Sequence, residues 1–331
     1  MALRRRMILG AAMTGAIGTG LGRARAALLP FGGALTVATG EPGGGFAEYG
    51  PDWGQAIARA AHITLSYRAS GGSAANILLV EQGAAQLGLT TMAVAAQAWQ
   101  GDAAWTGRVR LRGFRALFPI YPAAWQVIAP RGGRIRRLED LAGAVIGVGP
   151  AGGASAVLTG PLLGALRGRI VPRLMITGLY GEQIAMMRAG KLDACAFLGI
   201  TPLPALVAAA HDGGFNLIGV DKQEAAAMRR AVAGIADGAI PRTSLPGQRI
   251  AVPTIGSRAI AIGRADLPDR LVATLTAAAL DHPILPGSGM SRTDWISDDD
   301  PVAIHPGAVA VLRKYGYAAP ARLIGDALIH S

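Results

Sequence analysis

The sequence contains a single cysteine, Cys195, among its 331 residues. One cysteine excludes an intrachain disulfide framework and any metal site with several cysteine ligands. It lies in the apolar run LDACAFLG, which predicts a small buried side chain and not a reactive thiol. No two of the five histidines are spaced to share a metal ion, so no metal site is expected. Each is interpreted as a surface or capping residue: His62, His211, His282, His305 and His330.

Motifs for catalysis and nucleotide binding are also missing. There is no G-x-S-x-G nucleophile motif and no Walker loop, and GEPGGG (40–45) lacks the spacing of a dinucleotide-binding turn. The SDDD run at 297–300 lacks the spacing of a calcium loop and is interpreted as a solvated turn. Basic residues are spread out except for RGGRIRR (131–137), interpreted as a surface face. The sequence therefore predicts a protein that is not an enzyme and has no cofactor, metal or nucleic-acid partner.

No apolar run is long enough to span a bilayer, but the first 26 residues have the pattern of an export signal. A basic start containing Arg4–Arg6 precedes a weakly apolar stretch that ends in the small-x-small site Ala24–Ala26. The arginine pair fits the twin-arginine route as well as general secretion, and a disordered or buried N-terminal helix is the alternative. Removing residues 1–26 removes five arginines and changes the net charge from +11 to 11 − 5 = +6. The predicted location is the periplasm.

The remaining chain alternates apolar runs, glycine-rich turns and helical patterns, which favours an α/β fold with parallel strands. A strand is expected at 34–40, and the helix after it is expected to begin at Pro51 because proline is favoured at a helix start. A second strand at 63–70 precedes a helix that a serine at position 73 would cap and that would end near Gly83.

Two long extended segments interrupt this alternation. Residues 111–133 form two extended runs separated by prolines, and residues 248–263 form another. As crossovers they would divide the chain into lobe I (34–125 and 256–331) and lobe II (126–255). Ligands of open α/β sheets bind where strand carboxyl ends and helix N-termini meet, so a ligand cleft is expected between the lobes. Closure of the lobes over a ligand is the motion expected of such a fold.

Three glycine turns are candidates for that cleft: Thr39–Gly45 (the first turn), Ser70–Ser73 (the second) and Gly149–Ser155 (the third). Each follows an expected strand and opens an expected helix. Exposed N–H groups at a helix N-terminus favour an anion such as a carboxylate or phosphate. For any one of these turns, the alternative is a tight turn between a strand and a helix that binds no ligand. Ser73 and Ser155 are interpreted as helix caps.

Ordered motifs through the chain resemble the TAXI-type solute receptors of tripartite (TRAP) transporters. The first is ATGEPGGGF (38–46), followed by SGGS (70–73) with Asn76 to Leu79, and then by GAAQLGLT (83–90). Later motifs are LEDLAG (138–143), AGKLDACAFLGITP (189–202) and HPGAVAVLRKYG (305–316). They extend over about residues 35 to 317 in the family's order.

The resemblance implies a two-lobe type II periplasmic-binding-protein fold with a central ligand cleft. It also implies capture of a small anionic or zwitterionic carboxylate, such as an organic acid or glutamate, for the permease subunits of a TRAP transporter. Matching positions give the candidate ligand-binding residues Thr39, Gly40, Gly44, Ser73, Asn76, Tyr121, Gly152 and Ser155.

Some residues depart from the family pattern. Glu41 and Pro42 replace a glycine and a threonine of the first turn, and Gly45 replaces a hydroxyl-bearing residue. Glu41 either faces solvent or adds negative charge to the cleft, where it would favour a ligand with an amine or a larger neutral ligand. These changes leave a second function open, that of a co-opted scaffold acting as a sensor partner or accessory protein with altered or lost ligand binding.

Overall fold

The computed structural model describes residues 34–168, 170–210, 214–283, 292 and 294–324. The expected export signal at 1–26 and two of the histidines, His211 and His330, lie outside the described residues. No helix in the described part of the chain is long and apolar enough to cross a membrane. From Ala34 onward the chain forms one compact unit built on a ten-stranded sheet.

The first part of this unit alternates strands and helices, as the sequence predicts. Its central strand, β1, pairs in parallel with β2 and with β3, and α2 packs on β3. β3 is buried along its whole length, which explains its continuous apolar and small-residue sequence. The elements are β1 (Ala34–Ala38), α1 (Gly45–Ala61), β2 (Thr64–Arg68), α2 (Ser73–Glu81), β3 (Leu87–Thr91) and α3 (Met92–Gln100).

Helix α1 begins at Gly45 and contains Pro51, so the expected start at Pro51 is wrong. The glycine turn already supplies the start of the helix, because the carbonyl of Gly44 accepts from the N–H groups of Ala47 and Glu48. The carboxylate of Glu48 accepts from the N–H of Gly43 at 2.8 Å. These bonds stabilise the turns that precede the proline.

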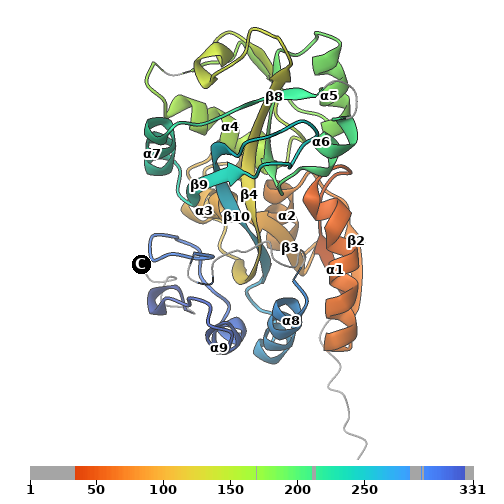
Figure 1. Ribbon diagram of the computed structural model, residues 1–331. Coiled ribbons are helices and arrows are strands. Elements are labelled where there is room, and N and C mark those ends of the chain that lie inside the picture. The colour runs from red at the N-terminus through yellow and green to blue at the C-terminus, as the bar shows by residue number, and fades with distance from the viewer. Residues whose placement is uncertain (1–33, 169, 211–213, 284–291, 293, 325–331) are drawn as a thin grey trace, which may run out of the picture. The chain divides into compact units, whose positions relative to one another are not determined.

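Two long strands, β4 (Phe114–Pro130) and β10 (Val252–Arg264), pair with each other in antiparallel fashion and run through the middle of the sheet (Figure 1). The two proline-separated runs expected at 111–133 are therefore one continuous strand. Register shifts in the β4–β10 pairing lie near Pro119 and Pro122, where irregular pairing accommodates residues without an N–H donor. Both segments are extended crossovers, as predicted.

The second part of the unit continues the sheet on the other side of β4, in the order β4-β7-β5-β6. β8 pairs with β4, and β9 pairs with β10. Its elements are β5 (Val145–Gly147), α4 (Ala154–Gly164), β6 (Leu174–Ile176), α5 (Tyr180–Arg188), β7 (Ala194–Gly199), α6 (Pro204–Ala209), β8 (Phe215–Ile218), α7 (Lys222–Ala231) and β9 (Ile235–Ile240). The sequence patterns missed α3, α7 and β9.

The chain closes with α8 (Asp269–Asp281) and α9 (Pro306–Lys314), which pack against each other. Short 3-10 turns lie at Ala104–Thr106, Leu138–Leu141 and Ala321–Leu323. We refer to β2-β1-β3-β10-β4 as the first half of the sheet and to β4-β7-β5-β6 as the second half. This arrangement confirms the predicted two-lobe α/β fold with two extended crossovers. The lobe boundaries given above stay a prediction.

The structure also tests three smaller predictions. Cys195 is fully buried in the core beside Met187 and Phe197, as expected. His305 is the N-cap of α9, and its Nδ1 accepts from the N–H of Gly307. The interpretation of SDDD (297–300) as a solvated turn is wrong for its last residue, Asp300. That carboxylate is buried and pairs with Arg258 at 2.8 Å, a partner brought close by the fold and not by the local sequence.

Candidate functional site

A small cavity lies between the two halves of the sheet, where the three glycine turns meet. Its volume is about 30 Å³, which leaves room for only about two water molecules. Its walls come from both halves: Gly40, Glu41, Gly44, Gly45, Phe46, Gly71, Gly72, Ser73, Thr91, Tyr121, Ala123, Gly153, Ala154, Tyr180, Leu198, Gly199 and Leu203. We call it the central cavity.

Three helices begin at the central cavity. The first residues of α1, α2 and α4, which are Gly45, Ser73 and Ala154, all line it. The N–H groups in the first turn of a helix have no partner inside the helix and carry partial positive charge. The meeting of the three turns therefore places the positive ends of three helix dipoles around one cavity.

The serines do not cap these helices as expected. The N-cap residues are Gly72 and Gly153, and neither helix has a side-chain cap. Gly72 has φ +110° and ψ −144°, a conformation that residues with a Cβ rarely adopt, so the sequence places glycine there and serine one position later. Ser155 lies within the first turn of α4, and its Oγ accepts from the N–H of Leu198.

Direct backbone contacts close the central cavity. The carbonyl of Gly152 in the third turn accepts from the N–H groups of Ala74 and Ala75 at the start of α2, at 2.9 and 3.1 Å. The carbonyl of Gly43 accepts from the N–H of Ala205 at 3.1 Å. A Cβ on Gly152 would lie 2.7 Å from the Cβ of Ala75, so this approach requires glycine. Part of the helix dipole expected to hold a ligand is thus neutralised by the protein itself.

Four of the eight predicted ligand-binding residues line the central cavity: Gly40, Gly44, Ser73 and Tyr121. The other four, Thr39, Asn76, Gly152 and Ser155, are adjacent to it and do not form its wall. Their polar groups hold the turns in place. For example, Thr39 Oγ1 donates to the carbonyl of Arg68 at 3.2 Å.

Asn76 is the clearest positioning residue among them. Its side chain is fully buried, and its amide nitrogen donates to the carbonyls of Thr39 and Leu89. Its amide oxygen accepts from the hydroxyl of Ser70. One side chain thereby joins the residue after β1 and the middle of β3 to the second turn. Replacing Asn76 would leave several buried polar groups without partners.

The motif comparison missed Phe46, Thr91 and Tyr180 as wall residues of the cavity. Thr91 is 2 % exposed, and its hydroxyl has no hydrogen-bond partner in the structure. An unpaired buried hydroxyl at a cavity wall is a group that a ligand could satisfy. The signal that could have identified Thr91 is its place at the carboxyl end of β3, where ligands of α/β sheets bind.

Two tyrosines provide neutral hydroxyls at the cavity. Burial raises the pKa of Tyr121 well above its ordinary value, with nearby Tyr180 and Tyr49 adding to the effect. Burial together with the charge of Glu41 raises the pKa of Tyr180 to about 12. Both groups therefore stay protonated and can donate hydrogen bonds at neutral pH.

Among the described residues that line the central cavity, Glu41 is the one with a charged side chain. It is half-buried, and no lysine or arginine in the described part of the chain lines the cavity with it. Gly45 has a steric role in the same turn, since a Cβ there would lie 2.7 Å from Ile200 and 2.9 Å from the hydroxyl of Tyr121. The absence of a hydroxyl at position 45 therefore follows from close packing between the two halves.

Fold and site together define a two-lobe α/β protein whose glycine turns meet at a cavity between the lobes. The model of the NMT1-like family matches residues 37–316, and the chain belongs to this family.

Solved structures with a similar fold include the GluR0 ligand-binding core from Nostoc punctiforme in complex with L-glutamate. The two share 16 % identity over 76 % of this chain and 95 % of that one, with a TM-score of 0.49. An ancestral arginine-binding protein bound to arginine shares 14 % identity over 75 % and 92 %, with a TM-score of 0.48. An amino acid ABC transporter substrate-binding protein from Streptococcus pneumoniae bound to L-arginine shares 14 % over 75 % and 88 %, with a TM-score of 0.45.

Proposed function

We propose that this protein is an exported solute-binding receptor that captures a small carboxylate in the central cavity and delivers it to a membrane permease. The observation that carries the proposal is the meeting of three helix N-termini at one cavity between two lobes. Backbone N–H donors in such an arrangement bind a carboxylate through hydrogen bonds and catalyse no reaction on it. The resemblance to TAXI receptors supports a TRAP-type permease as the partner and the periplasm as the location.

The wall chemistry favours an amino acid over a simple organic acid. A carboxylate would face the helix N-termini and the hydroxyls of Ser73, Thr91 and Tyr121, and an ammonium group would face Glu41. The cavity must widen to admit such a ligand, because about 30 Å³ is far below the roughly 300 Å³ and more of typical ligand sites. Separation of the two lobes at the crossovers would provide this space.

The test is thermal stabilisation of the full chain by a panel of amino acids and organic acids, with affinities of the hits measured by calorimetry. L-Glutamate and 2-oxoglutarate form an informative pair because they differ in the ammonium group. We expect the Glu41→Gln variant to lose preference for the amino acid, while Glu182→Gln, at an exposed glutamate, keeps it. Thr91→Val should lower the affinity for any compound that binds the wild type, and it should leave the melting temperature of the unliganded protein nearly unchanged. No stabilisation by any compound would argue against the receptor function.

A second function is favoured by the backbone contacts that close the cavity. Because Gly152 already occupies two N–H groups at the start of α2, the chain could serve as an accessory or sensor-partner scaffold with lost ligand binding. The same panel applied to the Gly152→Ala variant distinguishes the two functions. If the protein is a receptor held closed, a compound of the panel should raise the melting temperature of the Gly152→Ala variant. If it is a scaffold, no compound should raise the melting temperature of either the variant or the wild type.

A further inference from the structure

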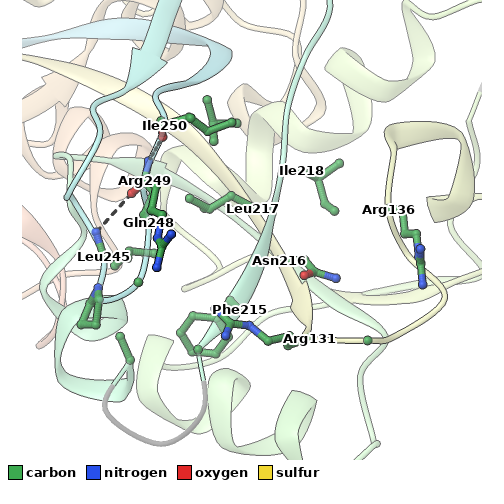
Figure 2. Close-up of a pocket in the computed structure, with 16 residues that line it drawn as sticks. Arg131, Arg136, Phe215, Asn216, Leu217, Ile218, Leu245, Gln248, Arg249 and Ile250 are labelled. Atoms are coloured by element: carbon green, nitrogen blue, oxygen red, sulfur yellow. Dashed lines mark hydrogen bonds between the residues drawn. The ribbon is translucent and has the colours of Figure 1, made fainter.

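A groove of about 520 Å³ lies along β8, outside the central cavity (Figure 2). All four residues of the strand, Phe215–Ile218, line it, and residues 245–250 form the opposite wall. Successive side chains of a strand point to opposite faces, so a groove over one face would contact every second residue. Lining by consecutive residues indicates that the groove follows the edge of β8. We call it the β8 groove.

The shape of the groove follows from two chain segments that diverge. The N–H of Val220 donates to the carbonyl of Pro253 at 2.9 Å, so the chain just after β8 contacts the start of β10. From there the segments separate toward Phe215 on one side and Leu245 on the other. β8 pairs with β4 along one edge, and among the described residues no strand pairs with its other edge. In an antiparallel pair, alternate residues direct their N–H and C=O groups away from the partner strand, which leaves such groups available here.

Three arginines line the β8 groove: Arg131, Arg136 and Arg249. None of the residues lining it is acidic, and none of these three side chains forms an ion pair within the described part of the chain. By contrast, Arg134 and Arg137 of the same RGGRIRR segment pair with carboxylates. Among the described residues, the groove therefore carries positive charge that no ion pair neutralises.

The positions of these charges distinguish an extended partner from a small anion. Figure 2 shows Arg131 directed toward Phe215, Arg249 on the opposite wall, and Arg136 apart from both. A small anion is best held by donors that converge on one point, whereas charges distributed along a groove match an extended chain. Ile250 adds an apolar contact at the rim, where it is 73 % exposed.

We propose that the β8 groove binds an extended acidic segment of a partner protein, which adds as a strand to the free edge of β8. Main-chain hydrogen bonds to the edge provide affinity, and the three arginines select glutamate or aspartate side chains. The proposal does not use the central cavity, so it is independent of the ligand captured there.

The test measures binding of short synthetic peptides to the full chain by calorimetry. The probe is a peptide of alternating glutamate and valine, compared with the lysine–valine peptide and with a form N-methylated at alternate backbone amides. The protein variant replaces Arg131, Arg136 and Arg249 together by glutamine. The control replaces three exposed arginines outside the groove in the same way and so has the same net charge: Arg59, Arg230 and Arg270.

We expect the glutamate peptide to bind wild type and the control variant, and the lysine peptide to bind neither. Loss of three exposed ion pairs should weaken binding to the groove variant by about tenfold, and added salt should weaken binding to wild type. N-methylation should abolish binding because it removes the donors that pair with the strand edge. Equal binding by the groove variant or by the N-methylated peptide, or no binding at all, would overturn the proposal. Binding of citrate with no binding of the peptide would identify a small-anion site instead.

Discussion

Replacing Gly152 by alanine should separate the two halves of the sheet at the central cavity. The Gly152 carbonyl joins the halves by accepting from the N–H groups of Ala74 and Ala75. An alanine Cβ at this position would lie 2.7 Å from the Cβ of Ala75, a distance that Cβ atoms essentially never reach. The third turn or the start of α2 must therefore move, and both hydrogen bonds lengthen or break.

The expected magnitude follows from those two bonds. A backbone hydrogen bond contributes a net of about 0.5–1.5 kcal/mol, so the pair favours the closed state by about 1–3 kcal/mol. An energy of that size changes the ratio of closed to open molecules by about 5- to 150-fold. Contacts such as the bond from Ala205 to Gly43 remain, so the variant should stay folded while the open state becomes populated.

Distances between spin labels on the two halves would measure this opening. Labels at Arg59→Cys in α1 and Arg230→Cys in α7 occupy exposed positions, and the native Cys195 does not compete because it is fully buried. We expect a longer and broader distance distribution in Gly152→Ala. Gly164→Ala is the control, since a Cβ there meets no atom within 4 Å. A distribution identical to that of the parent protein would refute the role of Gly152 in holding the halves together.

Three further predictions concern buried polar groups. Asp300→Asn should lower the free energy of unfolding by about 3–5 kcal/mol because it leaves Arg258 without its buried partner. Asp298→Asn, at an exposed neighbour, should change it by less than about 0.5 kcal/mol in the same urea titration. Burial keeps the pKa of His305 below its ordinary value, although Asp269 partly offsets the shift. Unfolding free energy should therefore fall as the pH drops below about 6.5, since the unfolded chain takes up the proton first, and His305→Asn should reduce that dependence. Burial raises the pKa of Cys195 to about 12, so a thiol reagent at mildly alkaline pH should modify it only in denaturant.

The local parts of the fold could be predicted from sequence because they depend on local signals. A glycine-terminated apolar run located β1, and the two long extended segments located β4 and β10. Helix α3 was missed because it follows β3 directly, without a loop or a glycine turn to mark its start. The continuity of β4 through two prolines depends on its pairing with β10, a contact between segments more than a hundred residues apart.

The candidate site could be predicted only in part, for a similar reason. Matching motifs identified the three turns, and four of the eight residues taken from them line the cavity. Thr91 and Tyr180 enter the wall through the folding of distant segments, and no motif contains them. Asn76 belongs to a motif, yet its side chain bonds to Thr39, which follows β1, and to Leu89 within β3, and it does not line the cavity. A matching motif identifies residues at or near a site. It does not distinguish the residues that line the cavity from those that hold the lining residues in place.

The contact between the turns changes what the glycines imply about ligand binding. Bare backbone can approach an anion, and it can equally approach other backbone, as Gly71 and Gly152 do here. A ligand that enters between the halves must first replace the two hydrogen bonds to Gly152, so its apparent affinity is reduced by the small fraction of open molecules. If the protein is a receptor, Gly152→Ala removes part of this cost, and the variant should capture ligand faster than wild type. If the closed form is the functional state of a scaffold, the variant should open without acquiring a ligand.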